Sequence, residues 1–105
     1  MDTRKSIGVY LQTIRIGRGL TQDELAALLG TSSRNISRWE SGANEIGLFT
    51  LLDLLNIIRG SAGDLQRIAA EDIDEDGAIA LAHRHIEQNK GTITIEHVRS
   101  RFEQE

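Results

Sequence analysis

The sequence predicts an all-α protein, and three observations support this prediction. Apolar residues recur at intervals of three and four along most of the chain, which is the spacing of one face of a helix. The runs are interrupted by glycine and never by proline, since the chain has 10 glycines and no proline. Serine and threonine stand where helices need an N-terminal cap. With 105 residues, 39% apolar and 27% charged, the chain has the composition of a globular protein.

The first two expected helices are indicated by an apolar stripe and a capping motif. Ile7, Leu11 and Ile14 share one face of the first helix, and Tyr10 flanks them. The second helix begins at residues 21–24, TQDE, which form a capping box. In this motif the threonine hydroxyl accepts the backbone N–H three residues on, and the glutamate carboxylate accepts the backbone N–H of the threonine.

A third helix is expected after a turn of only three residues. The turn comprises residues 30–32 and starts with a glycine, which suits the left-handed end of the preceding helix. Ser32 is the expected N-cap of the third helix. Ile36 and Trp39, three residues apart, form its buried side, and Gly42 ends it.

A fourth and a fifth helix follow. The fourth fits residues 48–58, with Gly60 as its stop. Ser61 and Asp64 resemble a second capping box, which opens a short fifth helix. The residues of the fourth helix expected to face the core are Leu48, Leu51, Leu52, Leu55 and Ile58.

Residues 71–105 are expected to be an appendage to a helical domain formed by residues 1–70. An acidic connector leads into a sixth helix from about residue 76 to 89, and residues 92–102 fit a short strand or, as we prefer, a last helix. The first segment carries eight Lys/Arg and seven Asp/Glu, whereas the second carries four and nine. An anionic partner is therefore expected to meet residues 1–70 and to be repelled by residues 71–105.

The stretch from residue 22 to 42 is the most informative. Two helices joined by a three-residue turn with a glycine are typical of a helix-turn-helix. Ala26 is small enough to let the two helices approach closely, and Ile36 and Trp39 direct one side of the third helix to the core. The other side is polar and basic, as a helix that reads the major groove needs to be. Its residues are Ser33, Arg34, Ser37, Arg38 and Ser41.

The chain resembles the Cro/phage-repressor-like (Xre) helix-turn-helix family over residues 7–70. The matching residues read LTQDELA at 20–26, LG at 29–30 and NISRWESG at 35–42. The resemblance implies a five-helix, repressor-like helix-turn-helix domain, here with a C-terminal helical extension. It also implies a transcriptional regulator that binds double-stranded DNA.

The resemblance assigns roles to individual residues. Ser33, Arg34 and Arg38 correspond to the base-reading positions of the family. An arginine prefers guanine, because it can bind the O6 and N7 atoms together. Arg15 and Glu40 correspond to an ion pair between the first and third helices, which we expect to be structural. The candidate contacts to the DNA backbone are Thr21, Gln22, Ser32, Asn35, Ser37, Ser41 and Asn44.

The loop after the third helix departs from the family pattern. Many members carry Lys or Arg just after the position of Gly42, and a proline before the next helix, whereas residues 43–47 here read ANEIG. Each missing cation is expected to weaken phosphate binding and to lower the slope of affinity against salt by about one log unit.

The apolar residues of the C-terminal segment either fold back on the five-helix core or meet a second copy of the chain. A homodimer is the favoured hypothesis, because five helices already complete the unit in this family. Two copies would place their helix-turn-helix units about 34 Å apart, as a repressor of a pseudo-palindromic site requires. The residues expected in this contact are Ile79, Ala82, Ile86, Ile95, Val98 and Phe102.

Two alternative hypotheses remain open. In the first, residues 72–105 form an antitoxin-like interaction module that binds a heterologous partner protein, and DNA binding serves only autoregulation. The acidic charge and apolar stripe of this segment suggest it. In the second, the domain has kept the fold but lost DNA binding, which Glu45 and the modest positive charge of residues 1–70 suggest.

Metal binding and catalysis are not expected. The chain has no cysteine, which excludes disulfides, cysteine-ligated zinc and iron–sulfur clusters. The run Asp72–Gly77, DIDEDG, matches the first half of a calcium-binding EF-hand loop, but His83 stands where the site needs a bidentate glutamate. His83 and His85 are two residues apart and do not share a helix face. No catalytic constellation is recognisable, so neither enzyme activity nor a cofactor is expected.

The sequence also bears on location. No apolar run approaches the ~20 residues of a membrane span, and the first residues do not resemble a signal peptide. We therefore expect a cytoplasmic protein without a membrane partner.

Overall fold

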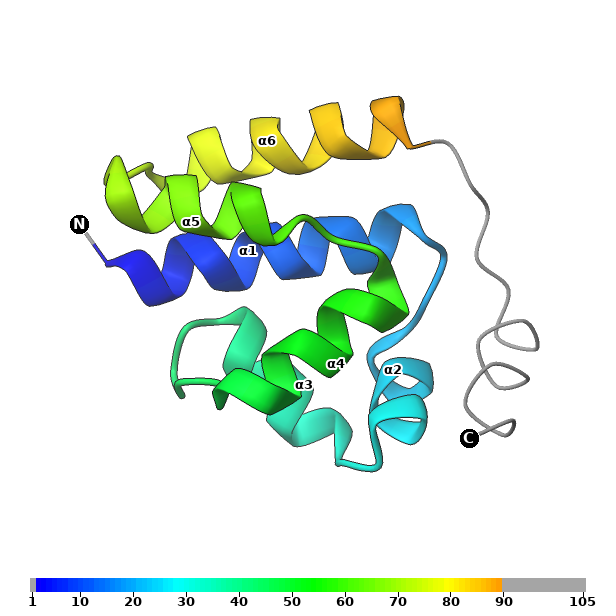
Figure 1. The fold of residues 1–105 in the computed structure, drawn as a ribbon. Helices are drawn as coiled ribbons and strands as arrows, with labels where there is room; N and C mark the ends of the chain where they lie inside the picture. Colours follow the sequence, from blue (N-terminus) through cyan, green and yellow to red (C-terminus); the bar gives the residue numbers. More distant parts are fainter. Residues whose placement is uncertain (1, 90–105) are drawn as a thin grey trace.

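The computed structural model of the protein describes residues 2–89, which form six helices and no strand (Figure 1). This confirms the predicted all-α fold of five short helices followed by a helical extension. The expectation of a strand or helix over residues 92–102 lies outside the described residues. The helices are α1 (Thr3–Gly17), α2 (Gln22–Leu29), α3 (Ser33–Glu40), α4 (Leu48–Ile58), α5 (Ala62–Ala70) and α6 (Glu75–Gln88).

Side-chain caps start most of these helices where the sequence predicts them. The Thr21 hydroxyl accepts the backbone N–H of Glu24 at 3.1 Å, and the Glu24 carboxylate accepts the backbone N–H of Thr21 at 2.9 Å. Ser32 and Ser61 cap α3 and α5 through bonds of 3.2 Å each. Asp74 caps α6 in the same way at 2.8 Å. Each cap satisfies a backbone donor that the helix itself leaves without a partner.

Tyr10 lies at the centre of the core rather than at the flank of the first apolar stripe. Its side chain is fully buried, and its hydroxyl donates to Asp64 Oδ2 at 2.7 Å while it accepts the backbone N–H of Ser61 at 3.1 Å. Burial, and next the hydrogen bond to Asp64, raise the pKa of Tyr10 above its ordinary value. The tyrosine therefore joins α1 to the start of α5.

α6 packs on α1 (Figure 1), which corrects the expectation that its apolar face meets a second copy. Ala82 is fully buried in the core of the chain itself, and Ile86 packs against that core. A Cβ added at Gly17 would collide with the Ile86 side chain, so α1 has a glycine where α6 approaches closely. The expected boundary between residues 70 and 71 thus falls within one packed core. Of the other residues proposed for the contact, Ile79 is partly exposed on α6, and Ile95, Val98 and Phe102 lie outside the described residues.

The inward face of α4 also differs from the expectation. Leu55 and Ile58 are buried as expected and Leu51 packs against the core, but Leu48 and Leu52 lie on the exposed side. Leu54 and Ile57 are buried instead. The helix has apolar residues on almost every side, so its sequence alone does not determine which side faces the core.

Arg18 joins the ends of three helices. Its buried guanidinium donates to the carbonyl oxygens of Ile58 (Nε, 3.0 Å), Arg59 (Nη2, 3.2 Å) and Asn89 (Nη1, 2.8 Å), which lie at the C-terminal ends of α4 and α6. Burial, and next the charge of Arg59, lower the pKa of Arg18. A cation suits this position because the last carbonyls of a helix carry partial negative charge.

Candidate nucleic-acid interface

The turn between α2 and α3 sets the geometry of the candidate interface. Gly30 ends α2 in the left-handed conformation with φ of 73°, and the backbone N–H of Thr31 donates to Ala26 O at 2.9 Å. Ala26 is buried where the two helices meet. Ile36 is fully buried and Trp39 is half-buried, so the expected side of α3 faces the core.

The opposite side of α3 lies in solvent. Arg34 and Arg38 are exposed and one helical turn apart, and neither guanidinium has a hydrogen-bond or ion-pair partner among residues 2–89. Ser37 is exposed beside them, and Ser33 is partly exposed at the first turn. The arrangement presents two cationic donor groups on one face of a short helix.

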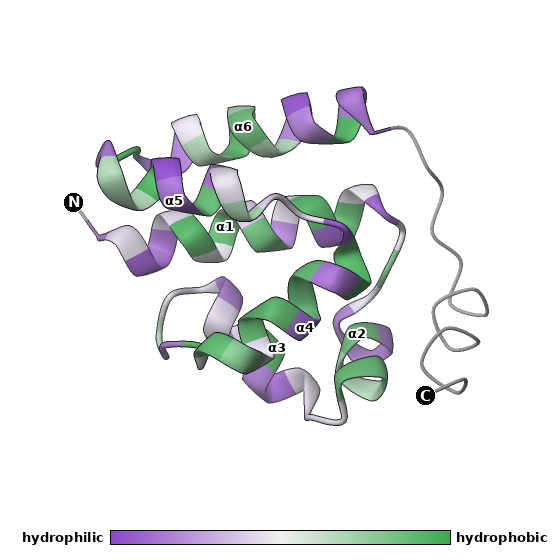
Figure 2. Cartoon of the chain, in the orientation of Figure 1, coloured by the Kyte–Doolittle hydropathy of each residue, from purple (hydrophilic) through white to green (hydrophobic). Residues whose placement is uncertain are grey.

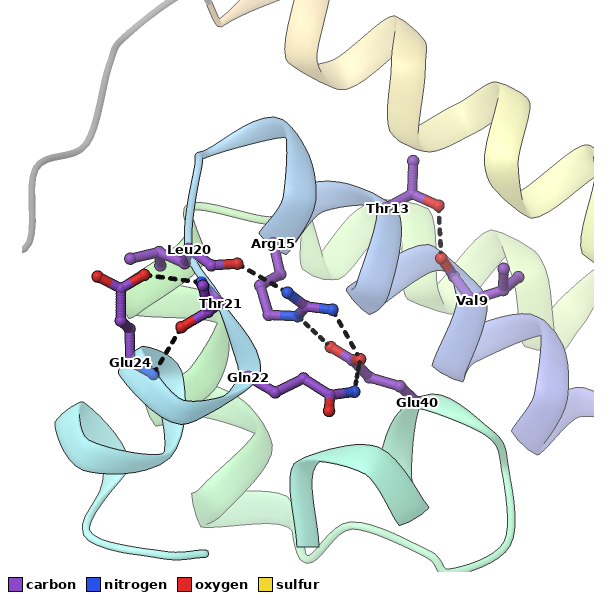
Figure 3. Close-up of polar contacts among 8 residues, drawn as sticks. All are labelled: Val9, Thr13, Arg15, Leu20, Thr21, Gln22, Glu24 and Glu40. Carbon is purple, nitrogen blue, oxygen red and sulfur yellow. Dashed lines mark hydrogen bonds and ion pairs between the residues drawn. The ribbon is translucent and has the colours of Figure 1, made fainter. Parts of the chain in front are cut away.

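A buried polar network holds α3 from behind (Figure 3). Arg15 Nε donates to Glu40 Oε2 at 2.6 Å, and Arg15 Nη2 donates to Glu40 Oε1 at 3.1 Å. The two side chains are only 8% and 5% exposed. Gln22 Nε2 donates to the same Glu40 oxygen at 2.9 Å, and Arg15 Nη1 donates to Leu20 O at 2.7 Å. The expected ion pair between the first and third helices is therefore present, and Gln22 extends it to α2.

This network fixes how α3 sits on the other two helices. A two-pronged arginine–carboxylate contact restricts the relative orientation of the groups that it joins. Gln22 has a defined structural partner, yet its amide nitrogen carries a second hydrogen that can donate elsewhere.

The other candidate contacts to the DNA backbone differ in whether their hydrogen-bond donors are already used within the chain. The hydroxyls of Thr21 and Ser32 accept backbone N–H groups, so their own hydrogens remain available. Asn35 Nδ2 donates to Thr31 Oγ1 at 2.9 Å. Ser41 Oγ donates to Arg38 O at 3.2 Å, which occupies its hydrogen, and Asn44 is exposed in the following loop.

Lys5 brings a cation to the loop that follows α3. Gly42 has φ of 78°, and a Cβ added there would lie 2.9 Å from the Cα atom of Lys5. The Lys5 side chain is exposed. Nothing in the sequence marks this lysine as part of the site, because the contact joins two distant parts of the chain. Its position places a positive charge beside the loop of residues 43–47, which carries none.

The acidic connector lies away from this surface. In Figure 1 the turn between α5 and α6 lies above α1, whereas α2 and α3 lie below it. The run Asp72–Gly77 occupies this turn and the start of α6. Within the described part of the chain, no three His, Asp or Glu side chains gather where they could hold a metal ion. No helix in residues 2–89 is long and apolar enough to cross a membrane.

Comparison with known proteins agrees with this geometry. A family model described as helix-turn-helix matches residues 11–65, which is just over half of the chain. The match runs from the middle of α1 into α5 and includes the whole of α2, α3 and α4. None of the curated proteins and none of the solved structures matches the chain.

Proposed function

Because the chain belongs to the Cro/C1-type helix-turn-helix family of DNA-binding transcription regulators, we propose that it is a sequence-specific repressor that reads the major groove with α3. One observation supports this proposal more strongly than the others. The exposed side of α3 presents Arg34 and Arg38 without partners among the described residues, while the buried side is fixed by the Arg15–Glu40 pair. A rigid helix with a basic exposed face is suited to the groove of double-stranded DNA.

In this proposal Arg34 and Arg38 each bind a guanine, and Ser33 contacts a base edge near the start of α3. Each two-pronged arginine–guanine contact contributes about 1–3 kcal/mol of discrimination against the wrong base. The rigid support matters, because a side chain must reach a base edge within hydrogen-bond distance.

The phosphate contacts surround α3. Thr21, Gln22 and Ser32 each keep a hydrogen that can donate to a phosphate, and Lys5 and Asn44 flank the other end of α3. Contacts of this kind position the protein on the duplex without reading its sequence. They also make binding sensitive to salt, because each neutralised phosphate releases counterions.

The test is selection of binding sites from a random duplex library with the intact chain, at fixed salt. We expect recovery of a sequence with G·C pairs, and Arg34→Ala or Arg38→Ala should each relax the preference at one base pair. Arg67→Ala is the matched control, because Arg67 is an exposed arginine on α5. Equal selectivity of the parent and both α3 variants would exclude the groove assignment.

The antitoxin-like alternative receives no support from residues 72–89. Two residues of its apolar stripe, Ala82 and Ile86, lie in or against the core of the chain and so are not open to a partner protein. The described residues therefore favour the repressor over this alternative.

A further inference from the structure

A small pocket opens between α1, the loop that follows α3, and α4. It measures about 220 Å³, and its apolar walls come from residues that belong to the core or pack against it. Figure 2 shows α4, which forms one wall, hydrophobic along most of its length. The apolar residues that line the pocket are Ile7, Leu11, Trp39, Ile46 and Leu51. Concave apolar walls with a few polar groups are typical of sites for small molecules.

Three polar side chains line the same pocket, and all three are exposed. Arg4 lies in the first turn of α1, and its Nε atom is 3.8 Å from Asp2 Oδ1, which already accepts the backbone N–H of Arg4. Asn44 and Glu45 lie in the loop, and neither side chain has a hydrogen-bond or ion-pair partner among residues 2–89. The pocket therefore has a cation, an amide and a carboxylate that are available to a ligand.

The two charges indicate the class of ligand. Arg4 and Glu45 have opposite signs and line one pocket, yet no ion pair joins them in the described part of the chain. A head group with an anion for Arg4 and a cation for Glu45 complements both, and the amide of Asn44 can donate to the anion or accept from the cation. Sites for drug-sized ligands measure about 300–1,000 Å³, so the apolar body that fits here is small. These requirements describe a free α-amino acid with a large apolar side chain.

We propose that this pocket binds a free amino acid with a large apolar side chain, and that the bound amino acid weakens the binding of the chain to DNA. The binding site is independent of the proposed function, whereas the effect on DNA rests on it. The first part is tested without DNA, so that the two can fail separately.

The loop connects the pocket to the groove-reading helix. The backbone N–H groups of Ala43 and Asn44 donate to the carbonyl oxygen of Arg38, at 2.9 and 3.3 Å. Trp39, which lines the pocket, follows Arg38 in the chain. A ligand that engages the Asn44 amide occupies a candidate phosphate contact and changes the loop that is bonded to the last turn of α3. DNA must then weaken the binding of the amino acid by the same factor, because coupling between two sites is reciprocal.

The first experiment measures binding of L-phenylalanine to the intact chain. Trp39 is the only tryptophan of the chain, so its fluorescence reports on the pocket directly. We expect a saturable change with one molecule bound per chain. A ligand of about 12 non-hydrogen atoms in a pocket open to solvent should have a dissociation constant on the order of 1 mM. Glycine, which has the same head group without the apolar side chain, is the control ligand.

Two analogues and two variants test the head group. 3-Phenylpropionate lacks the ammonium group and phenethylamine lacks the carboxylate, and each should bind about threefold more weakly than phenylalanine. Arg4→Gln should weaken binding of phenylalanine but not of phenethylamine, and Glu45→Gln should weaken binding of phenylalanine but not of 3-phenylpropionate. Arg67→Gln and Glu71→Gln are the matched controls, because both residues are exposed and neither lines the pocket.

The second experiment measures affinity for the duplex obtained by selection, with and without saturating phenylalanine. We expect the affinity for DNA to fall about fivefold or more with phenylalanine and to stay unchanged with glycine. In the Arg4→Gln/Glu45→Gln double variant, the same concentration of phenylalanine should have a smaller effect.

Three results would overturn the proposal. The absence of a saturable change in Trp39 fluorescence, at about ten times the expected dissociation constant, would exclude the site. Equal affinities for phenylalanine and its two analogues would show that the pocket does not recognise an amino-acid head group. Unchanged affinity for DNA at saturating phenylalanine would exclude the regulatory effect. If the parent binds phenylalanine but no duplex, the proposed function fails and the binding site is supported.

Discussion

Glu40→Ala is expected to destabilise the protein more than the loss of any exposed carboxylate, because Glu40 is part of the buried network behind α3. The substitution leaves the Arg15 guanidinium buried with Leu20 O as its remaining hydrogen-bond acceptor in that network. It also removes the acceptor of the Gln22 amide. Both consequences follow from the low exposure of the pair, 8% for Arg15 and 5% for Glu40.

The magnitude comes from the cost of an uncompensated buried charge. Removing one partner of a buried ion pair costs about 3–5 kcal/mol in the free energy of unfolding. The total free energy of unfolding of a domain is about 5–15 kcal/mol, so this loss is a large share of it. At about 4–8 °C per kcal/mol, the melting temperature should fall by about 12 °C or more.

The assay is urea and thermal unfolding followed by circular dichroism at pH 7. Glu71→Ala is the matched control, because Glu71 pairs with Arg67 at 3.0 Å but both side chains are more than half exposed. We expect no measurable change in the free energy of unfolding of this control, since solvent screens exposed ion pairs. Arg15→Met/Glu40→Leu should recover part of the loss, because it removes both charges. A cost below about 1 kcal/mol for Glu40→Ala would refute the reasoning.

Three further expectations follow from individual contacts. The raised pKa of Tyr10 predicts stability that is complete below about pH 10, the ordinary value for tyrosine, and is lost as the pH rises above it; this loss should be absent from unfolding curves of Tyr10→Phe. Gly42→Ala should destabilise more than Gly30→Ala in the same unfolding assay. Both glycines have positive φ, but only the Cβ at residue 42 would meet the backbone of Lys5, so equal costs would contradict the packing described. Lys5→Gln should reduce the slope of log affinity against log salt by about 0.9 without changing the selected sequence, and an unchanged slope would exclude Lys5 as a phosphate contact.

The sequence predicted the helix-turn-helix well because its signals are local. The capping box at Thr21 and Glu24 and the cap at Ser32 involve residues three apart, and the structure has the corresponding bonds. Gly30 adopts the left-handed backbone conformation that its place after α2 predicts. Such features depend on neighbours along the chain and so can be recognised without a structure.

The incorrect predictions concern packing between distant segments. The side of α4 that faces the core could not be determined, because apolar residues surround the helix and the choice depends on which neighbours it meets. The placement of Ala82 and Ile86 depended on whether α6 reaches α1, and Gly17 allows that approach. The sequence did not single out Lys5, because the residue lies near the candidate interface only through its close contact with Gly42.

The net charge of the chain is a poor guide to where DNA would bind. The chain carries −4 overall, yet the acidic turn between α5 and α6 lies across α1 from α3 (Figure 1). At physiological salt, exposed charges more than about 8 Å apart are largely screened from one another. The described part of the chain is 39 Å long, so a phosphate near α3 would respond mainly to Arg34, Arg38 and the polar groups around them. An acidic protein can therefore present a basic binding face, provided that the two kinds of charge are separated by the fold.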